Sequence, residues 1–166
     1  MNQGIHTVDL LLWLLGDVAS IQAKVRTALH DIEVEDTVVA AIEFSSGAIG
    51  TLEVATSVYP GYPRRLELTW SAGTIIVEND RVVSADLRTP IPEFRFEQPR
   101  PEDERSTTPV ISDVRGQRTI IEDFIRAIQT DGTPICDGYQ ARPSMEVVQA
   151  IYESSRTGQA VNPQSG

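Results

Sequence analysis

Residues 38–55, VVAAIEFSSGAIGTLEVA, form two apolar stretches separated by a short polar turn. In the first stretch Val39, Ala41 and Glu43 fall on one side of an extended chain, because successive side chains of a strand point to opposite faces. The turn is SSG at residues 45–47, residue types that favour chain reversal. This stretch therefore predicts an antiparallel β-hairpin.

Further alternating stretches predict more strands on both sides of this hairpin. One precedes it at residues 21–26, and three follow at 66–70, 74–78 and 81–85. Short turns between consecutive strands favour a largely antiparallel sheet, which often leaves one face uncovered. That face could line a ligand cavity or meet a second sheet. The apolar residues expected on it are Leu52, Val54 and Trp70.

Three amphipathic segments predict helices, because their apolar residues recur at spacings of three and four. They are residues 2–15, 117–130 and 142–156, the last with Pro143 in its first turn. The order of helix, strands and two helices indicates an α+β fold. We expect an open, largely antiparallel sheet with helices packed on one face.

The segment 87–116 has no hydrophobic period and holds five of the ten prolines of the chain. Loops of this length are usually functional, disordered or linkers. We predict that this segment is a mobile excursion over the surface. The chain, residues 1–166, is predicted to form one domain, since a single domain commonly has about 100–200 residues.

Charge and composition exclude several classes of protein. Fourteen basic and 24 acidic residues give a net charge of −10, which argues against general nucleic-acid binding. The longest apolar run, residues 10–15, is far shorter than the ~20 residues of a membrane-spanning helix. A single cysteine excludes an internal disulfide. We expect a cytoplasmic protein without a membrane or nucleic-acid partner.

His6, in the first predicted helix, is the strongest candidate for catalysis. Asn2 precedes it by four residues and Asp9 follows it by three, so the three side chains share one helical stripe. An imidazole oriented in this way can act as a general acid or base. The spacing also fits a core histidine that is merely hydrogen-bonded by Asp9, and by itself it favours this simpler interpretation.

The segment 59–65, YPGYPRR, is a second candidate site between two predicted strands. Its tyrosines and arginines could hydrogen-bond a hydroxylated or anionic ligand. An ordinary rigid turn with solvated arginines fits equally well. The proposed ligand-binding side chains are Tyr59, Tyr62 and Arg64.

Other signals for catalysis or cofactor binding are weak. His30 is expected to be a solvated loop residue, and Cys136 lacks the basic neighbour that would favour a reactive thiolate. Two histidines and one cysteine are too few for a recognisable zinc site. The chain also lacks a glycine-rich phosphate loop, so nucleotide chemistry would need a second domain or another chain.

Several blocks of the sequence resemble the C-terminal domain of the Gfo/Idh/MocA oxidoreductases, which include glucose–fructose oxidoreductase and inositol dehydrogenase. The first block, NQGIHTVDL at residues 2–10, is fairly specific, and the later blocks agree in order and spacing. The later blocks are WLLG at 13–16, GYPRRLE at 61–67, GTI at 73–75, EDFIRAI at 122–128, DG at 137–138 and IYESSRTG at 151–158.

The resemblance implies a fold like the C-terminal domain of glyceraldehyde-3-phosphate dehydrogenase. It implies an N-terminal Rossmann domain in cis that binds NAD or NADP, and hydride transfer with a sugar, cyclitol or related polyol. His6 matches the family histidine that exchanges the hydroxyl proton or orients the substrate. Asn2 stands where the family often has an aspartate. It further implies a homodimer through the open sheet face, with no metal.

Several consequences follow from the resemblance. The chain has no E-K-P motif, which the family carries in the Rossmann domain, and no cofactor-binding residue is assigned to it. We expect the chain alone to be inactive. The alternative is a non-catalytic ligand-binding or assembly module with the same fold. A free-standing hydrolase or lyase would need a nucleophile or metal cluster that the sequence does not offer.

Overall fold

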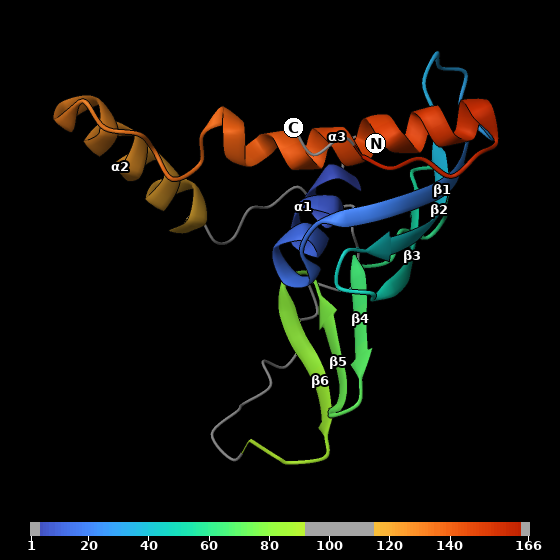
Figure 1. Ribbon diagram of the computed structural model, residues 1–166, viewed down its shortest axis with the longest axis horizontal. Coiled ribbons are helices and arrows are strands. Elements are labelled where there is room, and N and C mark those ends of the chain that lie inside the picture. The colour runs from blue at the N-terminus through green and yellow to red at the C-terminus, as the bar shows by residue number, and fades with distance from the viewer. Residues whose placement is uncertain (1–3, 92–114, 164–166) are drawn as a thin grey trace. The chain divides into compact units, whose positions relative to one another are not determined.

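A computed structural model describes residues 4–91 and 115–163 (Figure 1). Its contacts divide the chain into two compact units, of which one contains the described residues 4–57 and 115–163 and the other residues 58–91. Asn2 and most of the proline-rich segment, residues 92–114, lie outside the described part. Helices and antiparallel strands are both present, which confirms the predicted α+β class.

The first unit contains the predicted hairpin. Strands β1 (Val18–Arg26), β2 (Thr37–Phe44) and β3 (Ile49–Ala55) form an antiparallel sheet in that order. Ala40 of β2 is paired with Ala23 of β1 and with Leu52 of β3. The register places these three residues on the same face, because directly paired residues of neighbouring strands share a face.

The two faces of this sheet differ in burial. Along β2, Val38, Ala40, Ile42 and Phe44 are buried, whereas Val39, Ala41 and Glu43 are exposed. The prediction that Leu52 and Val54 lie on the uncovered face is wrong. Leu52 is only 4% exposed, and Val54 is paired with the buried Val38. Leu52 and Val54 follow the buried face because removing apolar surface from water drives folding.

Helices α1 (Gly4–Leu15) and α3 (Gly138–Thr157) complete the core of this unit. Helix α3 packs against β1, and α1 packs against α3. Buried apolar residues of the core come from each of α1, β1 and α3. They include Val8, Ile21, Val147 and Ile151.

Helix α3 begins earlier than the sequence predicts. The Asp137 carboxylate accepts a hydrogen bond from the Gln140 N–H at 2.9 Å and so caps the helix, which then starts at Gly138. Pro143 therefore lies inside the helix instead of in its first turn, which corrects the prediction. Gly158 ends the helix in the left-handed conformation, with φ of 74°.

The end of α3 covers the outer edge of β1. The hydroxyl oxygens of Ser154 and Ser155 accept hydrogen bonds from the backbone N–H groups of Ala23 and Val25, each at 2.9 Å. Ile21 and Val161 exchange two backbone hydrogen bonds of 2.8 Å. These contacts satisfy backbone groups that an edge strand would otherwise leave unpaired.

The second unit is a separate sheet. Strands β4 (Arg65–Trp70), β5 (Gly73–Glu78) and β6 (Arg81–Leu87) are antiparallel neighbours in that order. The six strands therefore divide between two sheets of three, where the sequence predicts one. No residue from 58 to 91 is fully buried within the described structure, and Trp70 is 45% exposed.

Helix α2 (Arg115–Thr130) confirms the predicted helix and begins two residues earlier. Its apolar side chains lie on one face, and that face is exposed. Ile121, Phe124, Ile125 and Ile128 have exposed fractions between 47% and 68%.

Candidate functional site

His6 lies in the first turns of α1, and its side chain is exposed. Val8 and Leu11, on another side of this helix, are buried. The imidazole has no hydrogen bond to a residue in the described ranges. His6 is therefore exposed and is not hydrogen-bonded to Asp9.

Asp9, one turn after His6, is anchored to a different helix. Its Oδ1 atom accepts a hydrogen bond of 2.8 Å from the hydroxyl of Ser144 in α3. Ser144 is 4% exposed and is separated from Asp9 by 135 residues of sequence. This contact is compatible with the expectation that Asp9 shares a helical stripe with His6, but no sequence pattern indicates Ser144 as the partner.

The other predicted site residues are distributed differently. Asn2 lies outside the described residues, and Tyr59, Tyr62 and Arg64 belong to the second unit. Tyr59 and Tyr62 are 99% and 77% exposed. The Arg64 guanidinium forms an ion pair with Asp80, in the turn between β5 and β6. The contacts thus group Asp9 with Ser144 and Arg64 with Asp80.

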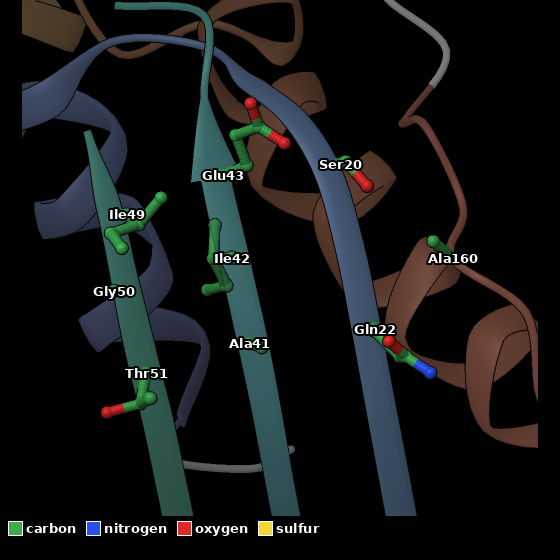
Figure 2. A pocket seen from close by; sticks show the side chains of 9 residues that line it. All are labelled: Ser20, Gln22, Ala41, Ile42, Glu43, Ile49, Gly50, Thr51 and Ala160. Atoms are coloured by element: carbon green, nitrogen blue, oxygen red, sulfur yellow. The ribbon is translucent and has the colours of Figure 1, made fainter. Parts of the chain in front are cut away.

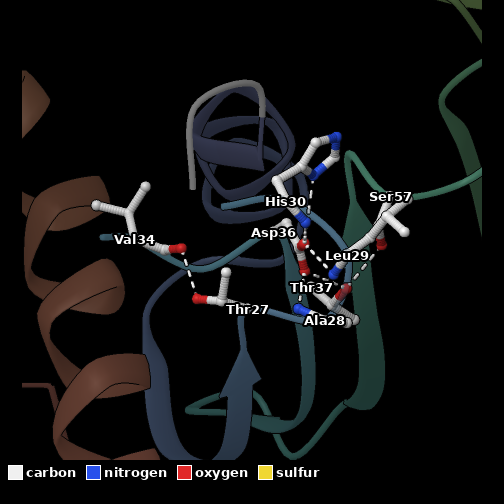
Figure 3. A network of polar contacts seen from close by, with 8 residues as sticks. All are labelled: Thr27, Ala28, Leu29, His30, Val34, Asp36, Thr37 and Ser57. Carbon is white, nitrogen blue, oxygen red and sulfur yellow. Dashed lines mark hydrogen bonds and ion pairs between the residues drawn. The ribbon is translucent and has the colours of Figure 1, made fainter. Parts of the chain in front are cut away.

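Sequence reasoning missed a buried carboxylate, Asp36, which organises the connection between β1 and β2 (Figure 3). Its oxygens accept hydrogen bonds from the backbone N–H groups of Ala28 and Leu29 at 2.8 Å and of His30 at 3.0 Å. These bonds, with that of His30 the largest, hold the pKa of Asp36 well below its usual range. Aspartate commonly binds nearby backbone N–H groups in turns, which is the one signal that the sequence offered.

His30 takes part in the same network. Its Nδ1 atom lies 3.2 Å from Asp36 Oδ2, and its side chain is 44% exposed. His30 is an exposed loop residue, as expected, but it is not merely solvated, because its Nδ1 atom contacts a buried carboxylate. Figure 3 shows the imidazole above the carboxylate that also binds the loop backbone.

The uncovered face of the first sheet carries a shallow hollow of about 580 Å³ (Figure 2). Its polar side chains include Gln22, Glu43 and Thr51, which come from three different strands. Ile49 adds an apolar side chain at its end. The predicted uncovered face therefore exists, but it is more polar than the sequence indicated.

Within 4–91 and 115–163, no three histidine, cysteine or acidic side chains are grouped so that they could hold a metal ion. None of the helices described there is long and apolar enough to cross a membrane.

The fold is that of the C-terminal domain found in dehydrogenase structures. Over its full length the chain superposes on 45% of the WlbA dehydrogenase of Bordetella pertussis, solved with NADH and UDP-GlcNAcA, with a TM-score of 0.78 and 28% identity. It also superposes on levoglucosan dehydrogenase, solved with NADH and levoglucosan, with a TM-score of 0.73. That match covers 98% of this chain and 49% of the other at 20% identity, which shows the fold alone.

The sequence comparisons agree with the fold. Residues 1–76 match the model of the GFO/IDH/MocA C-terminal domain, which confirms the resemblance. A curated relative, the uncharacterized oxidoreductase YrbE of Bacillus subtilis, is 24% identical over 94 residues. That match covers 54% of this chain and 28% of YrbE. The chain thus spans less than half the length of these relatives.

Proposed function

We propose that the chain is the substrate-binding domain of an NAD(P)-dependent oxidoreductase that acts on a sugar, cyclitol or related polyol. The observation that carries this proposal is the exposed His6, which lies on α1 within the residues matched by the family model. The similarity to the WlbA dehydrogenase, which binds NADH and UDP-GlcNAcA, supports a carbohydrate substrate.

His6 and Asp9 have different proposed roles. A ring nitrogen of His6 takes the proton of the substrate hydroxyl that is oxidised, as a general base. Asp9 accepts a hydrogen bond from a neighbouring hydroxyl through the oxygen that Ser144 does not hold. Asn2 cannot accept a proton, so its amide would orient His6 or the substrate. For Tyr59, Tyr62 and Arg64, which belong to the second unit, a role in ligand binding stays a prediction.

The residues of this chain do not fit a dinucleotide. The sequence contains no glycine-rich phosphate loop, and the sheets described in the structure are antiparallel, unlike a Rossmann domain. We propose that NAD or NADP is bound by a Rossmann domain in cis and supplies the hydride chemistry. The contribution of this chain is the binding of the substrate and the handling of its hydroxyl proton.

Assays of the complete gene product and of the 166-residue chain test this division. We expect NAD(P)H formation by the complete gene product with at least one member of a panel of sugars and polyols. The chain alone should show none. Turnover by the chain alone would contradict the need for a second domain. Inactivity of the complete product across the panel would favour the ligand-binding or assembly module.

The uncovered sheet face is proposed to form a homodimer. Val39 is half-exposed near the start of β2, and Ile49 is strongly exposed at the start of β3. The register places Lys24 and Glu53 on either side of Val39. Exposed apolar residues bordered by opposite charges are typical of a surface that can bind a second copy of itself.

A further inference from the structure

The hydrogen bond between Ser144 and Asp9 joins two helices that are far apart in sequence. The Ser144 hydroxyl donates to Asp9 Oδ1 at 2.8 Å. Val8 directly precedes Asp9 and is buried, and Val147 lies one turn after Ser144 and is also buried. The bond therefore borders the apolar contact between α1 and α3.

A second buried serine of the same helix has a different task. Ser154 is fully buried, accepts a hydrogen bond from the Ala23 N–H at 2.9 Å and donates one to the Gln159 carbonyl at 2.7 Å. Both partners of Ser154 are backbone groups, so this residue is structural. Ser144 instead binds the side chain of an exposed acidic residue.

We infer that Ser144 is a positioning residue that fixes the Asp9 carboxylate for substrate binding. This inference rests on the proposed function, since a fixed Asp9 matters only where a substrate hydroxyl meets it. With Oδ1 held by Ser144, the other carboxylate oxygen keeps one direction relative to His6, one helical turn away. A carboxylate that is ordered before binding loses less conformational freedom when the substrate arrives.

Steady-state kinetics of the complete gene product test the inference, with Ser144→Ala compared with Ser154→Ala. We expect Ser144→Ala to raise KM about tenfold, the size of one lost hydrogen bond, with little change in kcat. Ser154→Ala should leave KM unchanged. In an Asp9→Ala background, Ser144→Ala should have no further effect on KM. Equal KM values for the wild type and Ser144→Ala would overturn the inference.

Carbon-13 NMR of the 166-residue chain provides a readout that needs no activity. The Asp9 carboxyl resonance should shift in Ser144→Ala and stay in place in Ser154→Ala. An unchanged Asp9 resonance in Ser144→Ala would also overturn the inference. An inactive complete wild-type product would overturn the proposed function and the positioning role together. If the complete wild-type product is active and Ser144→Ala has the same KM, the positioning role alone is overturned.

Discussion

At the scale of single residues, Asp36 shows how one buried carboxylate can order a loop. Its hydrogen bonds to three consecutive backbone N–H groups satisfy donors that the turn would otherwise leave unpaired. The loop between β1 and β2 also contacts α3, because the Tyr152 hydroxyl donates to the Glu35 carboxylate at 2.9 Å. The loop is therefore held by the bonds between Asp36 and its first residues and by the bond between Glu35 and α3.

The lowered pKa of Asp36 has a consequence for stability at low pH. Since the carboxyl has a lower pKa in the folded chain than its unfolded value of about 4, its contribution is present above that pH. The contribution is lost as the pH falls below about 4. We expect Asp36→Asn to lower the midpoint temperature of unfolding at neutral pH. The decrease of this midpoint as the pH falls should be smaller in the variant than in the wild type.

Thermal unfolding followed by circular dichroism from neutral to acidic pH checks this expectation. Asp31→Asn is a matched control, because Asp31 is exposed in the same loop and its substitution removes the same charge. Equal pH dependence in the Asp36→Asn protein and the wild type would contradict the assigned role of the carboxylate.

At the scale of elements, the N-terminal cap of α3 is a testable contribution. Removing the Asp137 side chain in Asp137→Ala leaves the Gln140 N–H without its partner. We expect a loss of about 1 kcal/mol in the free energy of unfolding, measured by urea denaturation. Asp137→Ser keeps a capping oxygen and should retain most of the stability. A similar loss in both variants would argue against capping as the cause.

The second sheet depends on a glycine at the start of β5. Gly73 has φ of 150°, and a Cβ atom there would meet the Asp86 carbonyl oxygen and lie 2.8 Å from the Leu87 Cα atom. Gly73→Ala should therefore reduce the hydrogen-exchange protection of β4–β6 amides by more than ~1 kcal/mol. Gly116→Ala is the control, since nothing lies within 4 Å of its Cβ position. Unchanged protection in Gly73→Ala would contradict this steric assignment.

Elements of the fold were predictable where local sequence decides them. The hairpin of β2 and β3 and the helix at α2 follow from alternation, turn residues and helical spacing, which act over a few residues. The division of six strands between two sheets was not predictable, because pairing between distant strands leaves no local signal. The predicted start of α3 is too late, because the prediction places Pro143 in the first turn and the helix begins at Gly138.

The candidate site was only partly predictable for the same reason. His6 and Asp9 are close in sequence, so helical spacing places them on one stripe. Ser144 approaches Asp9 through the packing of α1 on α3, and no pattern in the sequence indicates that contact. The prediction that Leu52 and Val54 lie on the open face failed because these residues of β3 pair with buried residues of β2.

At the scale of the whole molecule, the uncovered sheet face predicts a dimer. We expect Val39→Asp to convert the dimer to a monomer in sedimentation equilibrium, because a charge would be buried at the centre of the interface. Ile135→Asp is the control, since Ile135 is exposed in the connection between α2 and α3. A monomeric wild type at high concentration would contradict the dimer.

The exposed His6 is expected to accept the proton of the substrate hydroxyl, and the comparison of two histidine variants tests this role. The turnover of the complete gene product is measured for His6→Ala and His30→Ala, with circular dichroism to verify folding. His6→Ala is expected to lower kcat by about 10²- to 10⁴-fold, the usual contribution of a general base, while His30→Ala changes it little. A folded His6→Ala protein that keeps wild-type turnover would contradict this role.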